Sequence, residues 1–199
     1  MKNIPPAIKW SGSKRPLADE ILSYFPRKIK TYYEPFCGGC SVMAKLLVSD
    51  IEVEDFVISD LNEDVISLWR QIKVDPSPIS SHYSILWEEL NKDNDLERMK
   101  EFYGYIRSRF NSKKSPLDFM FIMRTTTNGM PRYNRFGDFN NSFHITRNGI
   151  TPDKLEKILY TWHILLNERP VFFNNHSYEY VETLDEDDVL ILDPPYANT

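Results

Sequence analysis

Cysteine, long apolar runs and an excess of positive charge are all scarce in this sequence, and each scarcity excludes a class of protein. Two cysteines among 199 residues are too few for the disulfide framework of a small secreted domain. No apolar run reaches the roughly 18 residues of a membrane-spanning helix, and the first ten residues lack the apolar core of a secretory signal. We therefore expect a protein that works in the cytoplasm and does not contact the membrane. We also expect a monomer.

The charge is distributed unevenly along the chain. A formal net charge of −5 argues against a protein that coats nucleic acid indiscriminately. Residues 100–147, however, hold nine Lys or Arg and three acids, a net charge of +6, so the rest of the chain carries −11. A basic segment in an acidic protein is typical of a local phosphate-binding face. The alternative is a solvated loop whose charge asymmetry is accidental.

Apolar periodicity predicts an α/β fold with a parallel sheet, because strands and helices alternate at both ends of the chain. The predicted strands are 31–36, 55–60, 170–175 and 187–193, the last two of them buried. The predicted helices are 16–25, 62–73, 80–91, 96–110, 115–124 and 152–167, with one more directly after the glycines at 38–39. This order predicts a split α/β domain, residues 1–75 and 151–199, around a basic, mostly helical insertion, residues 76–150.

A glycine turn and a following aspartate indicate a nucleotide site. Gly38 and Gly39 come where the first strand gives way to a helix, so the backbone can approach a ligand closely there. Asp60 follows Gly39 by 21 residues and ends the next strand, a position from which a carboxylate binds ribose hydroxyls. The full G-x-G-x-x-G pattern is missing, which favours an adenosine-containing cofactor over a dinucleotide.

Cys37 and Cys40 form a C-x-x-C pair in the same turn, which allows redox or zinc chemistry as an alternative. A structural zinc ion would need two further ligands, yet no other cysteine exists and the four histidines are scattered. We therefore expect no metal site and interpret both cysteines as small residues that the turn accepts.

The sequence Asp193-Pro194-Pro195-Tyr196 carries the predicted chemistry. It follows the apolar run 189–192, so it is expected at the carboxyl end of a buried strand, where open α/β sheets bind ligands. An exocyclic amine on a base ring could donate to the Asp193 carboxylate and the Pro194 carbonyl. Those hydrogen bonds favour a pyramidal nitrogen with a free lone pair, and Tyr196 could stack on the base. The alternative is a turn that simply ends a strand.

Five segments in this order resemble the Dam-type (D12 class, alpha-group) DNA adenine-N6 methyltransferases. The segments are 9–14, 34–42, 59–62, 127–134 and 193–196. The resemblance covers nearly the whole chain and implies a Rossmann-like sheet and an inserted target-recognition region. It also implies methyl transfer from S-adenosyl-L-methionine to a flipped adenine in double-stranded DNA, with GATC as the leading site. Such enzymes occur in bacterial or phage DNA methylation, including restriction-modification. Family members continue for several strands beyond D-P-P-Y, so we expect those C-terminal strands to be absent here.

The resemblance also assigns cofactor contacts. Trp10 and Lys14 would contact the methionine portion, with Lys14 at its carboxylate. Phe36, Gly38 and Gly39 would form the loop beneath it. The remaining contacts implied are Asp60 at the ribose, Leu61 at the adenine face, and Ser177 and Tyr178 at the adenine edge. Asp193 is also expected to contact the cofactor.

In the insertion, Arg132 matches a family arginine that reads guanine, which a guanidinium does through two major-groove acceptors. Thr127 stands where the family often has an aromatic residue that enters the base stack. The other base contacts implied are Asn128, Met130 and Lys9, and Asn134 is a further expected DNA contact. Arg124, Arg135 and Arg147 could instead contact phosphates, which position the protein without specifying a sequence.

Two alternative functions stay open from the sequence. D-P-P-Y chemistry suits any conjugated exocyclic amine, so cytosine-N4 methylation is one. A truncated, non-catalytic fragment that binds the cofactor or DNA is the other. Carbon-5 methylation of cytosine is disfavoured, because it needs a thiolate nucleophile and no Pro-Cys pair occurs.

Overall fold

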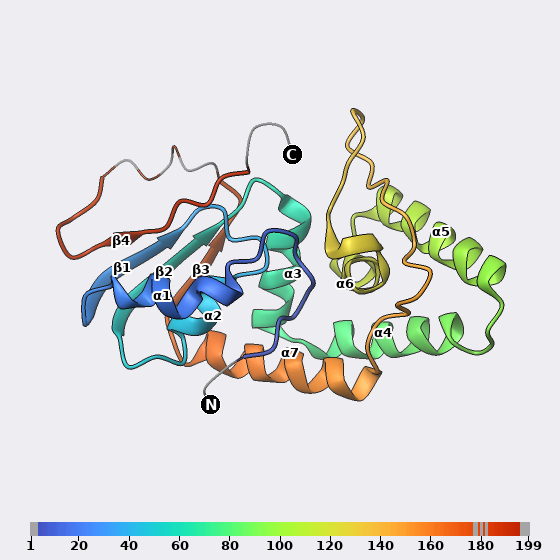
Figure 1. The fold of residues 1–199 in the computed structure, drawn as a ribbon, viewed down its shortest axis with the longest axis horizontal. Helices are drawn as coiled ribbons and strands as arrows, with labels where there is room; N and C mark the ends of the chain where they lie inside the picture. The colour runs from blue at the N-terminus through green and yellow to red at the C-terminus, as the bar shows by residue number, and fades with distance from the viewer. Residues whose placement is uncertain (1–3, 177–178, 180, 182, 196–199) are drawn as a thin grey trace.

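The computed structural model describes residues 4–176, 179, 181 and 183–195. Figure 1 shows an elongated molecule with a β-sheet towards one end and a group of helices towards the other. A single cluster of buried apolar side chains extends from the sheet into the helices. In the part of the chain that the structure describes, no helix has the length and apolar character to cross a membrane.

The sheet confirms the predicted α/β fold. Its strands are β1 (Lys28–Glu34), β2 (Glu52–Ser59), β3 (Val171–Asn174) and β4 (Val189–Leu190). They lie in the order β3-β2-β1-β4, and all three pairings are parallel. The chain thus builds outward from β1 to β3 and returns to the other side of β1 with β4. Ligands of open α/β sheets bind at such a switch point, outside the carboxyl ends of the strands.

Four helices belong to the same half of the molecule as the sheet (Figure 1). They are α1 (Ala18–Ser23), preceded by the 3-10 turn η1 (Arg15–Leu17), α2 (Ser41–Leu46), α3 (Glu63–Val74) and α7 (Pro152–Asn167). The buried Trp69 of α3 stacks on Phe173 of β3, with ring centroids 6.0 Å apart, and meets Trp162 of α7 at 4.7 Å. These aromatic contacts join α3 and α7 to the sheet.

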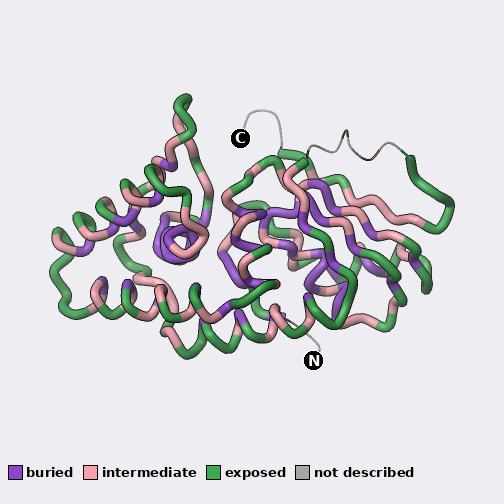
Figure 2. The backbone as a smooth tube through the Cα atoms, turned by 180° about the vertical axis from the view of Figure 1, so that it is seen from behind, coloured by how far each residue is buried: buried purple, intermediate pink, exposed green. Residues whose placement is uncertain are grey.

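The helical lobe consists of α4 (Ser77–Leu90), α5 (Leu96–Lys113), α6 (Pro116–Thr125) and the segment that follows to residue 150. Every residue from Asp118 to Thr125 is buried, and Figure 2 shows α6 as a buried coil in the middle of the lobe. α6 packs against α3, α4 and α5. Because the core passes through α6 without a break, the boundaries at residues 75 and 151 stay a prediction.

The last strand differs from its prediction. We expected a buried strand over 187–193, but β4 contains only Val189 and Leu190, both partly exposed, and Leu192 is 56% exposed. The reason is its place in the sheet: β4 pairs with β1 and is an edge strand among the described residues. An apolar run of this length cannot by itself distinguish an edge strand from a central one.

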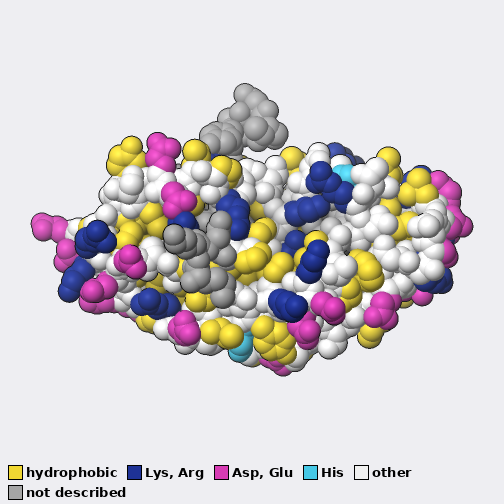
Figure 3. Space-filling model, turned by 60° about the horizontal axis from the view of Figure 1, so that its bottom comes forward, with side chains coloured by type: hydrophobic (Ala, Val, Ile, Leu, Met, Phe, Trp, Pro, Cys, Tyr) yellow, Lys and Arg dark blue, Asp and Glu magenta, His cyan; other side chains and the backbone are white. Residues whose placement is uncertain are grey.

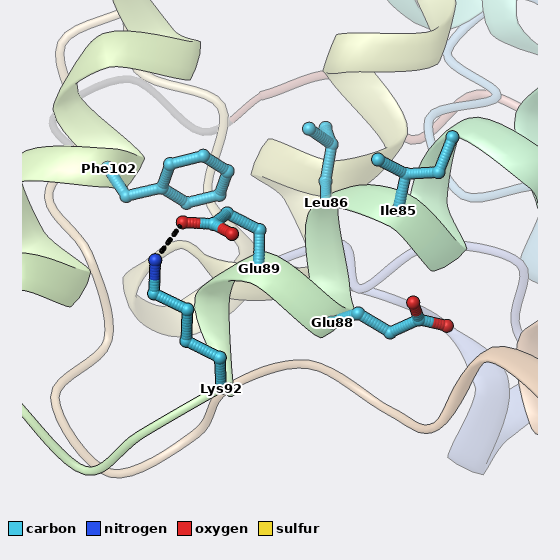
Figure 4. A pocket seen from close by; sticks show the side chains of 6 residues that line it. All are labelled: Ile85, Leu86, Glu88, Glu89, Lys92 and Phe102. Carbon is cyan, nitrogen blue, oxygen red and sulfur yellow. Dashed lines mark hydrogen bonds and ion pairs between the residues drawn. The ribbon is translucent and has the colours of Figure 1, made fainter.

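The helical lobe has a hollow of its own, but the polar side chains that line it do not converge on one point (Figure 4). It lies between α4 and α5 and is lined by Ile85, Leu86, Glu88, Glu89, Lys92 and Phe102. Its Glu89 and Lys92 form an ion pair with each other at 2.6 Å. The carboxyl edge of the sheet is therefore the better place for a chemical site.

Candidate active site

A cavity of about 480 Å³ lies at the carboxyl ends of β1 and β4. That volume is within the range of small-molecule sites. Its lining comes from five parts of the sequence: Trp10 to Lys14; Glu34, Phe36, Cys37, Gly39, Ser41 and Val42; Asp60 and Leu61; Met130 and Pro131; and Ile191, Asp193, Pro194 and Pro195. The switch point of the sheet thus brings most of the predicted cofactor residues to one place.

Two glycines allow Trp10 to lie directly on the turn between β1 and α2. Gly38 has a φ of +44°, and a Cβ there would meet the Trp10 Nε1 atom at 2.2 Å. A Cβ on Gly39 would meet the Trp10 Cβ at 2.9 Å. The Gly38 carbonyl also accepts a hydrogen bond from the indole of Trp69, at 2.9 Å. The turn therefore requires glycine because the indole packs against it.

Asp60 holds the glycine turn and the start of α3 together. One carboxylate oxygen accepts from the Gly38 amide and the other from the Asn62 amide, both at 2.9 Å. Burial raises the pKa of Asp60, and the two amide hydrogen bonds oppose that shift. A carboxylate has about four acceptor positions, so capacity remains for two hydroxyl groups in the cavity. The neighbouring Leu61 is 69% exposed and offers an apolar face there.

Lys14 and Asp193 meet across the cavity. The Lys14 Nζ lies 2.7 Å from an Asp193 carboxylate oxygen, and both side chains are about one quarter to one third exposed. The Lys14 amide donates to the Ser41 hydroxyl at the start of α2, at 3.0 Å. A residue predicted for the cofactor and a residue predicted for the reacting amine are thus in direct contact.

Glu34 is a cavity residue that the sequence analysis did not select. It ends β1, is only 5% exposed, and accepts hydrogen bonds from the Tyr32 hydroxyl at 2.8 Å and the Met43 amide at 3.2 Å. Burial raises the pKa of Glu34 to about 7, with smaller contributions from Asp193 and Asp60. The signal in the sequence was an acidic residue near the end of a strand, four positions before Gly38.

The two cysteines are free thiols in the core. Burial raises the pKa of Cys37 and of Cys40, which disfavours the thiolate that redox exchange and zinc binding both need. The turn also places Cys40 in the left-handed region, with a φ of +53°. This environment is that of small structural residues.

The segment after α6 forms part of the cavity wall. Met130, which is 45% exposed, and Pro131 line it beside the first turn. The Gly129 carbonyl accepts from the Ser11 amide at 3.2 Å, and a Cβ on Gly129 would meet the Lys9 Cβ at 2.4 Å. The segment that carries the predicted DNA contacts therefore packs on the segment that carries Trp10.

The predicted DNA contacts differ in how they are exposed. Asn128, Arg132 and Arg135 are exposed, and the Arg132 Nε donates to the Asn140 side chain at 2.9 Å. Asn134 instead uses its side-chain oxygen to accept from the amides of residues 136 and 138, so its amide group closes a turn. Figure 3 shows Lys and Arg side chains near the middle of one face, with Asp and Glu mainly towards its edges.

Arg124 is a correction to the predicted phosphate contacts. It is 4% exposed, and one of its nitrogens donates to the Pro6 carbonyl at 2.6 Å. Burial lowers the pKa of Arg124 to about 10. Since α6 is buried on all sides in its second half, a side chain at this position points into the core. Lys9 lies near it, and burial together with Arg147 and Arg124 lowers the pKa of Lys9.

Part of the basic segment likewise has an internal role. Arg109 forms two hydrogen bonds with the buried Asp118, one of them at 2.8 Å, and His82 binds the same carboxylate at 2.7 Å. These contacts join α4, α5 and α6. The positive charge between residues 100 and 147 is therefore divided between a surface and the core. The predicted residues Ser177, Tyr178 and Tyr196 lie outside the described residues.

Comparison with known proteins yields one family. A family model for the D12 class of N6 adenine-specific DNA methyltransferases matches residues 10–199. The type II methyltransferase M.MjaIII of Methanocaldococcus jannaschii is 31% identical over 97% of this chain and 69% of its own length. The DNA adenine methylase of Salmonella typhi is 30% identical over 99% of this chain and 66% of its own length. The Retron Ec67 DNA adenine methylase of Escherichia coli is 28% identical, over 96% and 64%.

The chain thus spans about two thirds of the length of the relatives it matches. The match runs from the Trp10 segment through the cavity-lining turns to the last described residues, so it includes every wall of the cavity. The chain belongs to the D12 class of N6 adenine-specific DNA methyltransferases.

Proposed function

We propose that this chain transfers a methyl group from S-adenosyl-L-methionine to the exocyclic amine of an adenine that has left the duplex. One observation carries the proposal. Asp193, Pro194 and Pro195 line the same cavity as Trp10 and Asp60, and residues of the segment after α6 complete its wall. A nucleotide-type site, a carboxylate suited to an amine, and a DNA-contacting segment therefore share one space.

The cavity fits S-adenosyl-L-methionine in three respects. Trp10, which packs on Gly38 and Gly39, lines it with an apolar ring. Asp60 keeps acceptor capacity for ribose hydroxyls, and Leu61 offers an apolar face for a purine ring. Lys14, which lines the cavity beside Asp193, provides a cation for the carboxylate of the methionine portion. When bound, this cofactor supplies an electrophilic methyl group.

Asp193 is the residue that would prepare the amine. The lone pair of an adenine amine is delocalised into the ring, so the nitrogen is a poor nucleophile until it becomes pyramidal. Asp193 and the carbonyl of Pro194 would accept hydrogen bonds from the amine and favour that geometry. Pro194 and Pro195 restrict the backbone, since each proline ring holds its φ near −65°. Lys14 would keep the Asp193 carboxylate oriented through their 2.7 Å contact.

DNA would meet the face where Arg132 and Arg135 are exposed. A base inside a duplex cannot reach a cavity at the edge of a sheet, so the target adenine must flip out of the stack. Met130 and Pro131 line the cavity, and they directly precede the exposed Arg132 in the chain. A base that leaves the duplex at this face would enter the cavity beside them.

Asp193→Ala tests the proposal, because it removes the acceptor and keeps the two prolines that restrict the turn. Loss of one preorganised polar group in an active site costs about 10²- to 10³-fold in rate. We therefore expect single-turnover transfer from labelled S-adenosyl-L-methionine into duplex DNA to fall by at least that factor. DNA binding should stay within a few-fold of the parent.

The matched control is Asp187→Ala, which removes an exposed carboxylate before β4. It should transfer methyl groups at the parental rate. Nucleoside analysis of the product should give N6-methyladenine. If the product is N4-methylcytosine, the target is cytosine and not adenine. Near-normal transfer by Asp193→Ala would refute the role of that carboxylate.

A further inference from the structure

Tyr133 connects the DNA-contacting segment to the cofactor-binding part of the molecule. It lies in the recognition hairpin, residues 132–140, where Tyr133 pairs with Phe139 and the Asn140 amide donates to the Arg132 carbonyl at 2.9 Å. Neighbouring side chains of an extended segment point to opposite sides. Arg132 is exposed, whereas the Tyr133 hydroxyl reaches the N-terminus of α3. The two residues thus face different partners from one short stretch of backbone.

The Tyr133 hydroxyl makes a short hydrogen bond to a carboxylate. It donates to Asp64 Oδ2 at 2.7 Å and lies within 3.4 Å of both polar atoms of the Asn62 side chain. Burial, followed by the Asp64 carboxylate, raises the pKa of Tyr133, so the hydroxyl keeps its proton at neutral pH. Its ring packs edge-on against Phe139, with centroids 5.6 Å apart. The side chain is therefore fixed at both ends.

Asn62 links this contact to the cofactor site. Its side-chain oxygen caps α3 by accepting from the Asp64 backbone amide at 3.0 Å. Its backbone amide donates to the Asp60 carboxylate at 2.9 Å. Asp60 also holds the Gly38 amide. One hydrogen-bonded residue, Asn62, therefore separates the Tyr133 hydroxyl from the carboxylate proposed for the ribose. A movement of the recognition hairpin would be transmitted to the groups that shape the cavity.

We propose that Tyr133 is a positioning residue that couples DNA binding to cofactor binding, through its hydrogen bonds to Asp64 and Asn62. The inference rests on the proposed function, because it requires one site for each ligand. Coupling between two sites is reciprocal: if DNA raises the affinity for the cofactor by some factor, the cofactor raises the affinity for DNA equally. Such factors are typically about 5- to 150-fold.

The experiment measures cofactor affinity with and without DNA. S-adenosylhomocysteine serves as the probe, because it carries no methyl group to transfer. Sheared genomic DNA serves as the second ligand, since it contains every short recognition sequence. Titration calorimetry on the parent gives the ratio of the two affinities. We expect Tyr133→Phe, which keeps the ring and loses the hydroxyl, to reduce this ratio at least fivefold. Asp64→Ala should reduce it similarly, and the double variant should lose little more.

Tyr103→Phe is the matched control. Its hydroxyl donates to the Asn141 carbonyl at 3.1 Å, so it joins the same segment to α5 without contacting the cofactor side. It should change the ratio less than twofold. An unchanged ratio in Tyr133→Phe, an equal loss in Tyr103→Phe, or no effect of DNA in the parent would overturn the coupling. A parent that binds no S-adenosylhomocysteine at all would instead reject the proposed function.

Discussion

The cofactor side and the DNA side of this molecule differ in how well residue type predicts side-chain placement. On the cofactor side, Trp10, Lys14, Phe36, Asp60 and Asp193 come from distant parts of the sequence and line one cavity. On the DNA side, the residues predicted from their type lie in different environments. Arg132 is exposed, Arg124 is in the core, and Asn134 closes a turn.

The difference follows from the local structure on each side. A residue that ends a strand in a parallel sheet lies at the carboxyl edge, whatever surrounds it. The segment from 126 to 150 has no helix beyond the short η2 (Thr127–Gly129) among its described residues, and two isolated bridges hold it. The direction of each side chain there depends on how the segment packs against α5, α6 and the segment that carries Trp10. Four predictions test this comparison.

The largest effect is expected at Glu34. Its carboxyl is buried with a pKa of about 7, above its ordinary value, so the fold favours the protonated form. The protonated carboxyl therefore contributes to the free energy of unfolding at low pH, and this contribution is lost as the pH rises from about 4.5 to 7. The difference between the two pKa values corresponds to about 3 kcal/mol. Glu34→Gln should remove this pH dependence and raise the free energy of unfolding at pH 8, measured by urea denaturation. A parent whose stability is constant between pH 5 and 8 would contradict the burial of this carboxyl.

Asp60→Ala should weaken cofactor binding by about tenfold to a hundredfold, since a lost hydrogen bond to a charged group costs about 1.5–3 kcal/mol. Titration calorimetry with S-adenosyl-L-methionine measures the change. Burial raises the pKa of Asp60, so parental affinity should decline on acidification at a higher pH than for an exposed aspartate. Asp55→Ala, which removes an exposed carboxylate on β2, the strand before Asp60, is the control. Equal binding by Asp60→Ala would remove Asp60 from the site.

Arg132→Ala should relax discrimination at one guanine by about 1–3 kcal/mol, because a bidentate contact to a base is lost. Arg135→Ala should weaken all sequences alike, since an arginine at a phosphate carries no sequence information. Competition binding with duplexes that differ at single positions separates the two. A uniform loss in Arg132→Ala would make Arg132 a phosphate contact.

The smallest effect on DNA binding is expected at Arg124. Arg124→Ala leaves the Pro6 carbonyl without its donor and should lower the free energy of unfolding by about 1–3 kcal/mol. The slope of log affinity against log salt should not change. Arg147→Ala, at an exposed position, should reduce that slope by about 1. A reduced slope in Arg124→Ala would place its guanidinium at DNA and restore the original prediction.

Much of the fold follows from short patterns in the sequence. The alternation of strands and helices predicted the parallel sheet, and the helices observed at Glu63–Val74 and Pro152–Asn167 lie within a residue or two of their predicted bounds. The predicted strand over 187–193 is shorter and less buried than expected. Hydropathy reports the apolar character of a run, but the number of neighbouring strands decides its burial.

Residue type and order alone determined that an acid ends two of the predicted strands, at Asp60 and Asp193, that glycines follow the first strand, and that prolines follow the last. Those features are local, and the parallel topology converts them into one site. Only the tertiary structure decided that Lys14 meets Asp193, that Tyr133 reaches Asp64, and that Arg124 faces Pro6. Each of these pairs joins residues far apart in the chain. Their geometry depends on how whole elements pack, which no local pattern contains.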